Sequence, residues 1–382
     1  MAWENRKSPP ALYLRTRSTA DRLRGRSAHG YRKIYKAMCK WGMTTIPYVG
    51  ELRWLSSQRP KSREIIRSVG APSPAPAWRI VGLMAFLVVI TGHMLRFTFN
   101  TDAITFTATA LGGAVLLARV ALAVGMRIIA TFVESCALLL AASICAVSLT
   151  VLVSTLGLPY ADPAMAAVDN VLLPFSWRQM VEALGPRHDL VTVMCAIYQS
   201  LNWQPFVLMA ALAIKADELT VWRFAHAWCL ALALSVAIFA IAPSVTAYVH
   251  YGINPSAMPA LTVNAGWRPA EVLHAIRDGS LREVTTFGVP GLITFPSFHA
   301  AGAMLLAWGF SKIRPFGLIF VSLNVAMLPC IPAIGSHYFV DVIGGIIVAG
   351  TSLLASSTKR ASSVRESASG KMINCGPAGA SL

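Results

Sequence analysis

Long apolar runs separated by polar turns dominate the chain from residue 80 onward. They cover residues 80–98, 104–124, 128–153, 189–214, 224–248, 297–311, 315–333 and 338–356. A helix needs about 20 predominantly apolar residues to cross the hydrocarbon core of a membrane. Most of these runs reach that length, although the run 297–311 is shorter. The pattern predicts an all-α, polytopic membrane helix bundle with about eight transmembrane helices.

The composition agrees with a membrane location. Hydrophobic residues make up 55% of the 382 residues and charged residues only 13%, whereas a soluble domain carries about 25% charged residues. The mean hydropathy is +0.58. These values exclude an ordinary soluble enzyme that is merely preceded by a signal peptide.

Basic residues are concentrated before the first apolar run. Of the 33 Lys and Arg residues, 17 precede residue 80, and only four acidic residues share that stretch. Positively charged segments tend to stay on the cytoplasmic side of a membrane. No aromatic-interleaved or zinc-type motif accompanies the charge, so we expect no nucleic-acid partner. We therefore interpret residues 1–78 as a basic, partly disordered cytoplasmic segment.

The charges of the loops predict an orientation for the bundle. With residues 1–78 in the cytoplasm, eight crossings bring three short basic loops to the same side, around Arg127, 215–223 and 312–314. Residues 357–382, rich in Ser, Ala and Gly, are expected to form a disordered cytoplasmic tail. The runs that start at residues 297 and 338 then both start on the opposite face. For a bacterial source, that face is the periplasmic side of the inner membrane.

A histidine and an aspartate mark the start of the last run. His337 and Asp341 are four residues apart, which places them on one face of a helix, one turn apart. A carboxylate inside a spanning segment is costly unless it has a partner. Asp341 can accept a hydrogen bond from one ring nitrogen of His337, which leaves the other nitrogen free as a nucleophile. The alternative is a structural pair that pins this helix.

A second polar motif begins the run at residue 297. Pro296 and Ser297 are typical of a helix start, where backbone N–H groups and a serine hydroxyl can hold an anion. His299 lies in the first turn and can act as a general acid and then as a general base. Alone, this motif is better explained by an N-cap serine with a neighbouring histidine. Together with His337 and Asp341 on one membrane face, it indicates a catalytic site.

The two motifs resemble the signatures of a known family. Residues Phe295 to Ala301 (Phe-Pro-Ser-Phe-His-Ala-Ala), and His337 to Asp341 (His-Tyr-Phe-Val-Asp) with Gly344-Gly345 after them, are similar to the second and third signatures of the type 2 phosphatidic acid phosphatase superfamily. The closer resemblance is to its inositol phosphorylceramide synthase-like, or inositolphosphotransferase, branch. It extends over residues 128–356, which would form the six-helix catalytic domain, preceded by two additional transmembrane helices in 79–127.

The resemblance implies a role for each residue. His337 would attack phosphorus and form a phosphohistidine, and Asp341 would orient it. His299 would act as acid and then as base, while Ser297 would help to hold the phosphate. The substrate would be a phospholipid or a sphingolipid-type lipid. The superfamily needs no metal or other cofactor for this chemistry.

The chain also departs from the phosphatase pattern. The third signature of the phosphatases has an arginine six residues before its histidine, where this chain has Ile331, and their first signature, a lysine followed by Arg-Pro, has no clean copy. The nearest Arg-Pro pair starts at Arg268, with Leu261 at the position of the lysine. Because the phosphate charge must still be balanced, we expect Arg268 and Arg277 to bind phosphate, unless they are ordinary loop charges. The missing arginines favour the transferase-like branch.

Several functions therefore remain open. The enzyme would either transfer a phospho-headgroup to another lipid or polyol, or hydrolyse a lipid phosphate or a prenyl pyrophosphate. Intramembrane His and Asp also serve proton relays in transporters, and a non-catalytic membrane protein is a further alternative. The seven cysteines are scattered without a CxxC motif, so neither a disulfide framework nor a zinc site is indicated.

Overall fold

The computed structural model describes residues 73–257, 261, 267–284 and 291–357. Within these ranges the chain is mostly helical, and a two-residue strand β1 (Thr98–Phe99) pairs in parallel with β2 (Glu283–Val284). Most of the predicted basic segment and of the predicted C-terminal tail lies outside the described residues.

The helices follow the predicted apolar runs and the loops between them. They are α4 (Ala75–Met94), α5 (Thr101–Ala123), α6 (Arg127–Val153), α7 (Asp162–Leu172), α8 (Trp177–Leu184), α9 (His188–Gln199), α10 (Gln204–Ile214), α11 (Glu218–Ile241), α12 (Ala247–His250), α14 (Arg268–Arg277), α15 (Phe298–Phe310), α16 (Gly317–Ile334) and α17 (Phe339–Ala355), with the 3-10 turns η1 (Ser154–Leu156), η2 (Ser200–Asn202) and η3 (Pro255–Ala257).

Five of these helices are long and apolar enough to cross a membrane, namely α4, α5, α6 extended by η1, α11 and α16. Three shorter apolar helices, α10, α15 and α17, occupy the remaining predicted runs. The prediction of an all-α membrane helix bundle is therefore confirmed. The three shorter helices have 11, 13 and 17 residues, fewer than the roughly 20 of a full span, so the number of crossings stays a prediction.

Two predicted runs are not continuous helices, and a proline accounts for each interruption. The run 189–214 is divided into α9, η2 and α10, and Pro205 stands in the first turn of α10, where its missing N–H is tolerated. The run 224–248 ends as a helix at Ile241, because Pro243 follows two residues later and disfavours the helical conformation of the residue before it. The resulting break at η2 lies beside the cavity described below.

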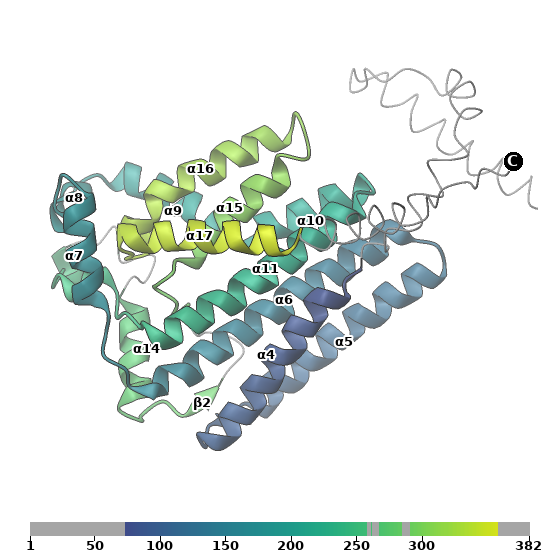
Figure 1. The fold of residues 1–382 in the computed structure, drawn as a ribbon, viewed down its shortest axis with the longest axis horizontal. Helices are drawn as coiled ribbons and strands as arrows, with labels where there is room; N and C mark the ends of the chain where they lie inside the picture. The colour runs from purple at the N-terminus through teal and green to yellow at the C-terminus, as the bar shows by residue number, and fades with distance from the viewer. Residues whose placement is uncertain (1–72, 258–260, 262–266, 285–290, 358–382) are drawn as a thin grey trace, which may run out of the picture. The chain divides into compact units, whose positions relative to one another are not determined.

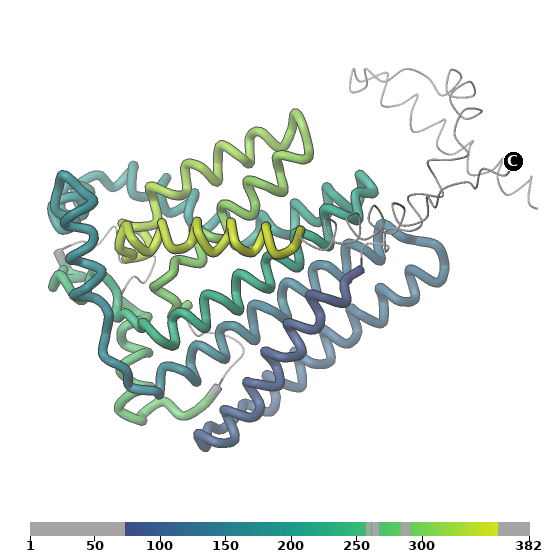
Figure 2. Tube along the Cα trace, in the orientation of Figure 1, coloured from purple at the N-terminus to yellow at the C-terminus, as the bar shows by residue number. Residues whose placement is uncertain are grey.

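The helices form two groups that share α11. Helices α4, α5 and α11 pack on α6, while α15 packs on α16 and α17, and α11 also contacts α15 and α17. Figure 1 and Figure 2 show these groups side by side, with α7, α8 and α14 gathered at one end of the bundle. Helix α17 starts at that end, whereas α4 starts at the other.

The first two helices are held to the rest by a buried acid. Glu134 of α6 accepts hydrogen bonds from Arg119 of α5, at 2.5 Å, and from the indole N–H of Trp78 in α4, at 3.3 Å. A carboxylate inside an apolar segment is stable only with such partners. This contact joins the helices of residues 79–127 to α6.

Glycine at position 345 allows α17 to approach α15 closely. A Cβ atom at Gly345 would lie 2.3 Å from the carbonyl oxygen of Ser297 and 2.7 Å from the Cβ of Ala300. Neither backbone nor a helix-borne methyl group moves cheaply, so this contact requires glycine. The crossing therefore places the start of α15 against α17.

We predict that Gly345→Ala lowers the thermal unfolding temperature of the purified protein, because overpacking of this kind costs about 1–3 kcal/mol. Gly350→Ala is the matched control on the same helix, since an added Cβ there meets nothing within 4 Å and alanine favours the helix. Unfolding followed by tryptophan fluorescence in detergent measures both. Equal unfolding temperatures for the two variants would contradict the close crossing.

Candidate active site

The start of α17 holds His337 and Asp341 together. The Nδ1–H of His337 donates to Oδ2 of Asp341 at 3.1 Å, and the same oxygen accepts the backbone N–H of Tyr338 at 2.9 Å. The two side chains are 5% and 0% exposed. Because Nδ1 carries the hydrogen, Nε2 of His337 keeps its lone pair. The predicted contact between His337 and Asp341 is present, but not the predicted helical geometry, because His337 lies two residues before α17 and only Asp341 is in its first turn.

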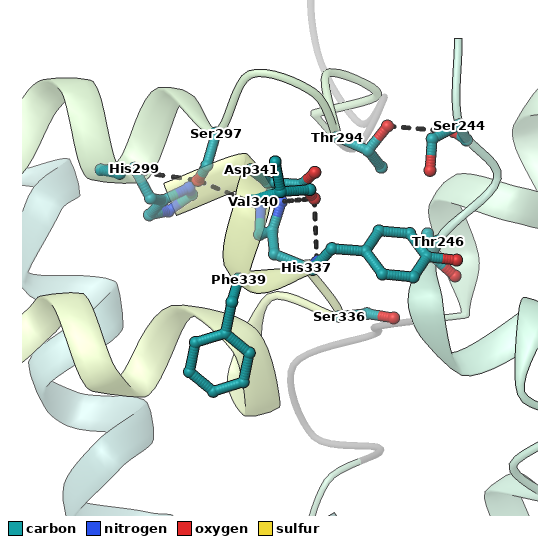
Figure 3. A network of polar contacts seen from close by, with 12 residues as sticks. Ser244, Thr246, Thr294, Ser297, His299, Ser336, His337, Phe339, Val340 and Asp341 are labelled. Atoms are coloured by element: carbon teal, nitrogen blue, oxygen red, sulfur yellow. Dashed lines mark hydrogen bonds and ion pairs between the residues drawn. The ribbon is translucent and has the colours of Figure 1, made fainter. Parts of the chain in front are cut away.

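The start of α15 lies directly against this pair. Ser297 is the N-cap of α15, and its hydroxyl oxygen accepts the N–H of Ala300 at 3.4 Å. The same hydroxyl lies 3.4 Å from Nε2 of His337, and the backbone N–H of Ser297 donates to the carbonyl of Asp341 at 3.0 Å. Figure 3 shows these side chains beside one another where the two helices begin. The two motifs of the sequence therefore form one site.

His299 enters the same site from the first turn of α15. Its Nδ1 lies 3.0 Å from the hydroxyl of Tyr198, and the two rings stack with centroids 3.9 Å apart. This contact fixes the ring and leaves Nε2 for other partners. Tyr198 lies at the end of α9, just before the break at η2, and nothing in the local sequence had marked it as a functional residue.

The backbone around His337 is held by groups from two other elements, α12 and α8. Ser336 has a positive φ of 56°, and its carbonyl and hydroxyl accept the N–H groups of Ala247 and Tyr248 at 3.0 and 2.9 Å. The indole N–H of Trp177 in α8 donates to the carbonyl of His337 at 2.9 Å. These bonds fix the unusual turn that directs the histidine ring inward.

Two carboxylates of α7, those of Asp162 and Asp169, also bind residues around His337. Both are buried, and their partners lie in α17 and in the segment between α11 and α12. Burial raises the pKa of the Asp169 carboxyl, while the N–H groups of Phe339 and Val340 oppose this shift by stabilising its charged form. These acids lie between two of the predicted apolar runs, and their spacing of seven residues was the available signal.

A cavity of about 610 Å³ opens beside the two histidines. Its polar end contains His299, His337, Thr246 and Tyr198, and its other walls come from α6, α10, α11 and the break at η2. The lining along α6 runs from Leu139 to Thr150, which spans about 16 Å at 1.5 Å per residue. The cavity thus joins a polar end to a long, mainly apolar wall.

The two predicted phosphate-binding arginines are placed differently. Arg277 donates to the carbonyl of Leu158 at 2.9 Å and lies 3.8 Å above the ring of Tyr160, so these contacts are with the segment after α6 rather than with the two helix starts. Arg268 is exposed at the start of α14, and the next residue, Pro269, lines the cavity. The structure therefore brings together His337, Asp341, His299 and Ser297, and places Arg268 beside the cavity.

Among the described residues, no group of three or more His, Cys, Asp or Glu side chains is arranged to hold a metal ion.

Comparison with known proteins gives one family match. A family model described as the PAP2 superfamily matches residues 163–355. This range includes both helix starts and all but the first residue of α7. No curated protein and no solved structure matches the chain.

Proposed function

The chain belongs to the PAP2 superfamily, whose helical membrane fold supports a lipid phosphatase-type function, and we propose that it cleaves or transfers a phosphoryl-type group of a lipid through a phosphohistidine on His337. The observation that carries the proposal is the orientation of His337. Asp341 holds its Nδ1–H, while Nε2 faces the N-terminus of α15 beside the cavity.

In the first step, Nε2 of His337 attacks phosphorus. A P–N bond forms and the P–O bond to the leaving group breaks, while His299 gives its proton to the leaving oxygen. Asp341 stabilises the positive charge that develops on the ring of His337. At the start of α15 the N–H groups of Ala300 and Ala301 bond to Ser297. Those of Phe298 and His299 precede the first intrahelical bond and, with Ser297, lie where an anionic phosphate binds favourably.

In the second step, the O–H group of water or of an alcohol loses its proton to His299. Its oxygen attacks phosphorus, the new P–O bond forms, and the P–N bond breaks to restore His337. Tyr198 suits both states of His299, because its hydroxyl oxygen accepts the Nδ1–H whether Nε2 carries a proton or has given it away. The same partner thus supports the acid role and the base role.

The lining of the cavity favours a substrate lipid whose phosphate is a singly charged diester. None of the described residues that line the cavity is Lys or Arg, so Arg268 beside it would balance one negative charge. A second charge on the phosphate would be uncompensated in this partly buried site, which is costly. A diester, as in a glycerophospholipid headgroup, carries one negative charge. This favours transfer of the headgroup to a sphingolipid-type or polyol acceptor, as in the inositol phosphorylceramide synthase-like branch, over hydrolysis of a phosphomonoester or a prenyl pyrophosphate.

We place the reaction on the membrane face opposite the basic segment 1–78. Helix α4, which follows that segment, starts at the end of the bundle remote from α7, α8 and α14 (Figure 1). With the segment in the cytoplasm, the site faces away from it. For a bacterial source this is the periplasmic side of the inner membrane.

The proposal is tested with purified protein and phosphorus-labelled lipids in detergent. We expect His337→Ala and His299→Ala each to lower kcat by about 100-fold or more, and Asp341→Asn to have a comparable effect because it removes the charge that stabilises the imidazolium. Only His337→Ala should also abolish labelling of the protein itself. His250→Ala, an exposed histidine at the same end of the bundle, is the matched control.

The products then distinguish the two reactions. Label on added ceramide, diacylglycerol or polyol supports transfer, whereas free phosphate supports hydrolysis. The enzymatic proposal is refuted if wild-type protein turns over no lipid, or if the histidine variants are as active as wild type. Either result would favour a transporter.

Tyr198→Phe tests the partner of His299. This change keeps the stacked ring but removes the hydroxyl, so we expect little change in the unfolding temperature and a loss of about tenfold or more in kcat. Because the hydroxyl no longer serves both protonation states of His299, the pH profile of kcat should also shift. An unchanged profile with unchanged kcat would remove Tyr198 from the mechanism.

The arginines are compared through single alanine variants. We expect Arg268→Ala to raise KM for the lipid by about tenfold, as for a lost charge-assisted contact to phosphate. Arg277→Ala should raise KM less than Arg268→Ala does. It should lower the unfolding temperature more, because it also loses the contacts with Leu158 and Tyr160. Arg282→Ala, whose guanidinium lies over Phe97, is the control. Equal KM values for all three variants would remove both arginines from phosphate binding.

A further inference from the structure

Helix α7 carries its acids on the buried face. Asp162 is 3% exposed and Asp169 is 1% exposed, whereas Val171 is 85% exposed. The two aspartates are seven residues apart, which places them on one face of the helix, about 10 Å from each other along its axis. A surface helix normally has the opposite arrangement, so the partners of these carboxylates must explain it.

Asp169 caps the N-terminus of α17. Its Oδ2 accepts the N–H of Phe339 at 2.7 Å and its Oδ1 accepts the N–H of Val340 at 2.9 Å. The first N–H groups of a helix have no intrahelical acceptor, and a carboxylate there is also favoured by the helix dipole. Both oxygens are used, and the two amides follow His337 by two and three residues.

Asp162 binds Tyr338, the residue just before the two that Asp169 caps. Its Oδ1 accepts the hydroxyl of Tyr338 at 3.0 Å and the hydroxyl of Ser244 at 2.8 Å, and its Oδ2 accepts the N–H of Val245 at 2.9 Å. Thr246, the next residue, lines the cavity. Asp162 therefore connects the residue after His337 to the segment that borders the cavity.

We propose that Asp169 and Asp162 are positioning residues, which hold the first turn of α17 so that Nε2 of His337 faces Ser297 and the cavity. Asp341 orients the ring of His337 only relative to the start of α17, since Asp341 is in the first turn of that helix and His337 lies two residues before it. The place of the turn relative to α15 depends on contacts from outside α17. Of those given above, α7 supplies three to residues 338–340 and two to residues 244–245. This inference rests on the proposed function of His337.

A displacement of about 1 Å at a reacting atom can lower a rate by about 100-fold. We therefore expect Asp169→Asn, which keeps the shape but replaces one acceptor oxygen by an NH2 group, to reduce kcat by about tenfold or more per folded molecule. KM should change little, because neither carboxylate lines the cavity. Asp169→Glu, which keeps two carboxylate oxygens, should recover part of the loss.

The experiment has one readout that does not need activity. Amide hydrogen exchange of the full chain in detergent, followed by mass spectrometry, should show faster exchange of the peptide that contains Phe339 and Val340 in Asp169→Asn. Asp189→Asn, an exposed acid in the first turn of α9, is the matched control and should leave both exchange and kcat unchanged.

The outcomes separate the possibilities. Faster exchange together with reduced kcat supports the positioning role. Unchanged exchange shows that Asp169 does not hold the turn, and faster exchange with unchanged kcat shows that it only stabilises the fold; either result overturns the inference. If wild-type protein turns over no lipid, the proposed function fails and the positioning role fails with it, while the exchange result still decides whether α7 holds α17.

Discussion

The carboxyl group of Asp341 is the point on which the site depends. In an apolar segment a carboxylate needs partners. This one accepts hydrogen bonds from the ring of His337 and from the backbone N–H of Tyr338. The carbonyl of the same residue accepts the N–H of Ser297. One residue thus orients the ring of His337, the proposed nucleophile, and joins α17 to the start of α15. The lack of a side chain at Gly345, one turn further on, lets the two helices come close enough for this bond.

Around this junction the chain supplies bonds from elements that are remote in sequence. Helix α8 donates through Trp177, α9 contributes Tyr198, and α7 contributes two carboxylates. Each of these groups binds either a histidine or the turn that carries it. An acid–base pair at a membrane face needs such support, because preorganised geometry rather than intrinsic reactivity provides much of the rate. The supporting elements all lie at the end of the bundle where the reaction is proposed to occur.

The cavity relates this polar end to the membrane. The break between α9 and α10 removes one turn of regular helix beside α6 and places Tyr198 and Asn202 on the lining. A substrate with a charged group and a long apolar part can then lie with its phosphate at the helix starts and its chain along α6. The scarcity of basic residues among the lining groups limits the charge that this end can accommodate, which is why we favour a phosphodiester.

The sequence by itself determined the membrane class and the eight apolar runs, because these depend on composition. The spacing of four residues also indicated the contact of His337 with Asp341, although His337 lies before α17 and not within it. The sequence also marked Ser297 and His299, since a helix start has a local signature. Tertiary structure decided what the local pattern does not contain. The contacts of Ser297 with His337, of Tyr198 with His299 and of Asp169 with Phe339 join residues 40, 101 and 170 positions apart. Such contacts arise only from the packing of helices, so Tyr198 had no local signal, and the seven-residue spacing of the acids of α7 did not indicate their partners.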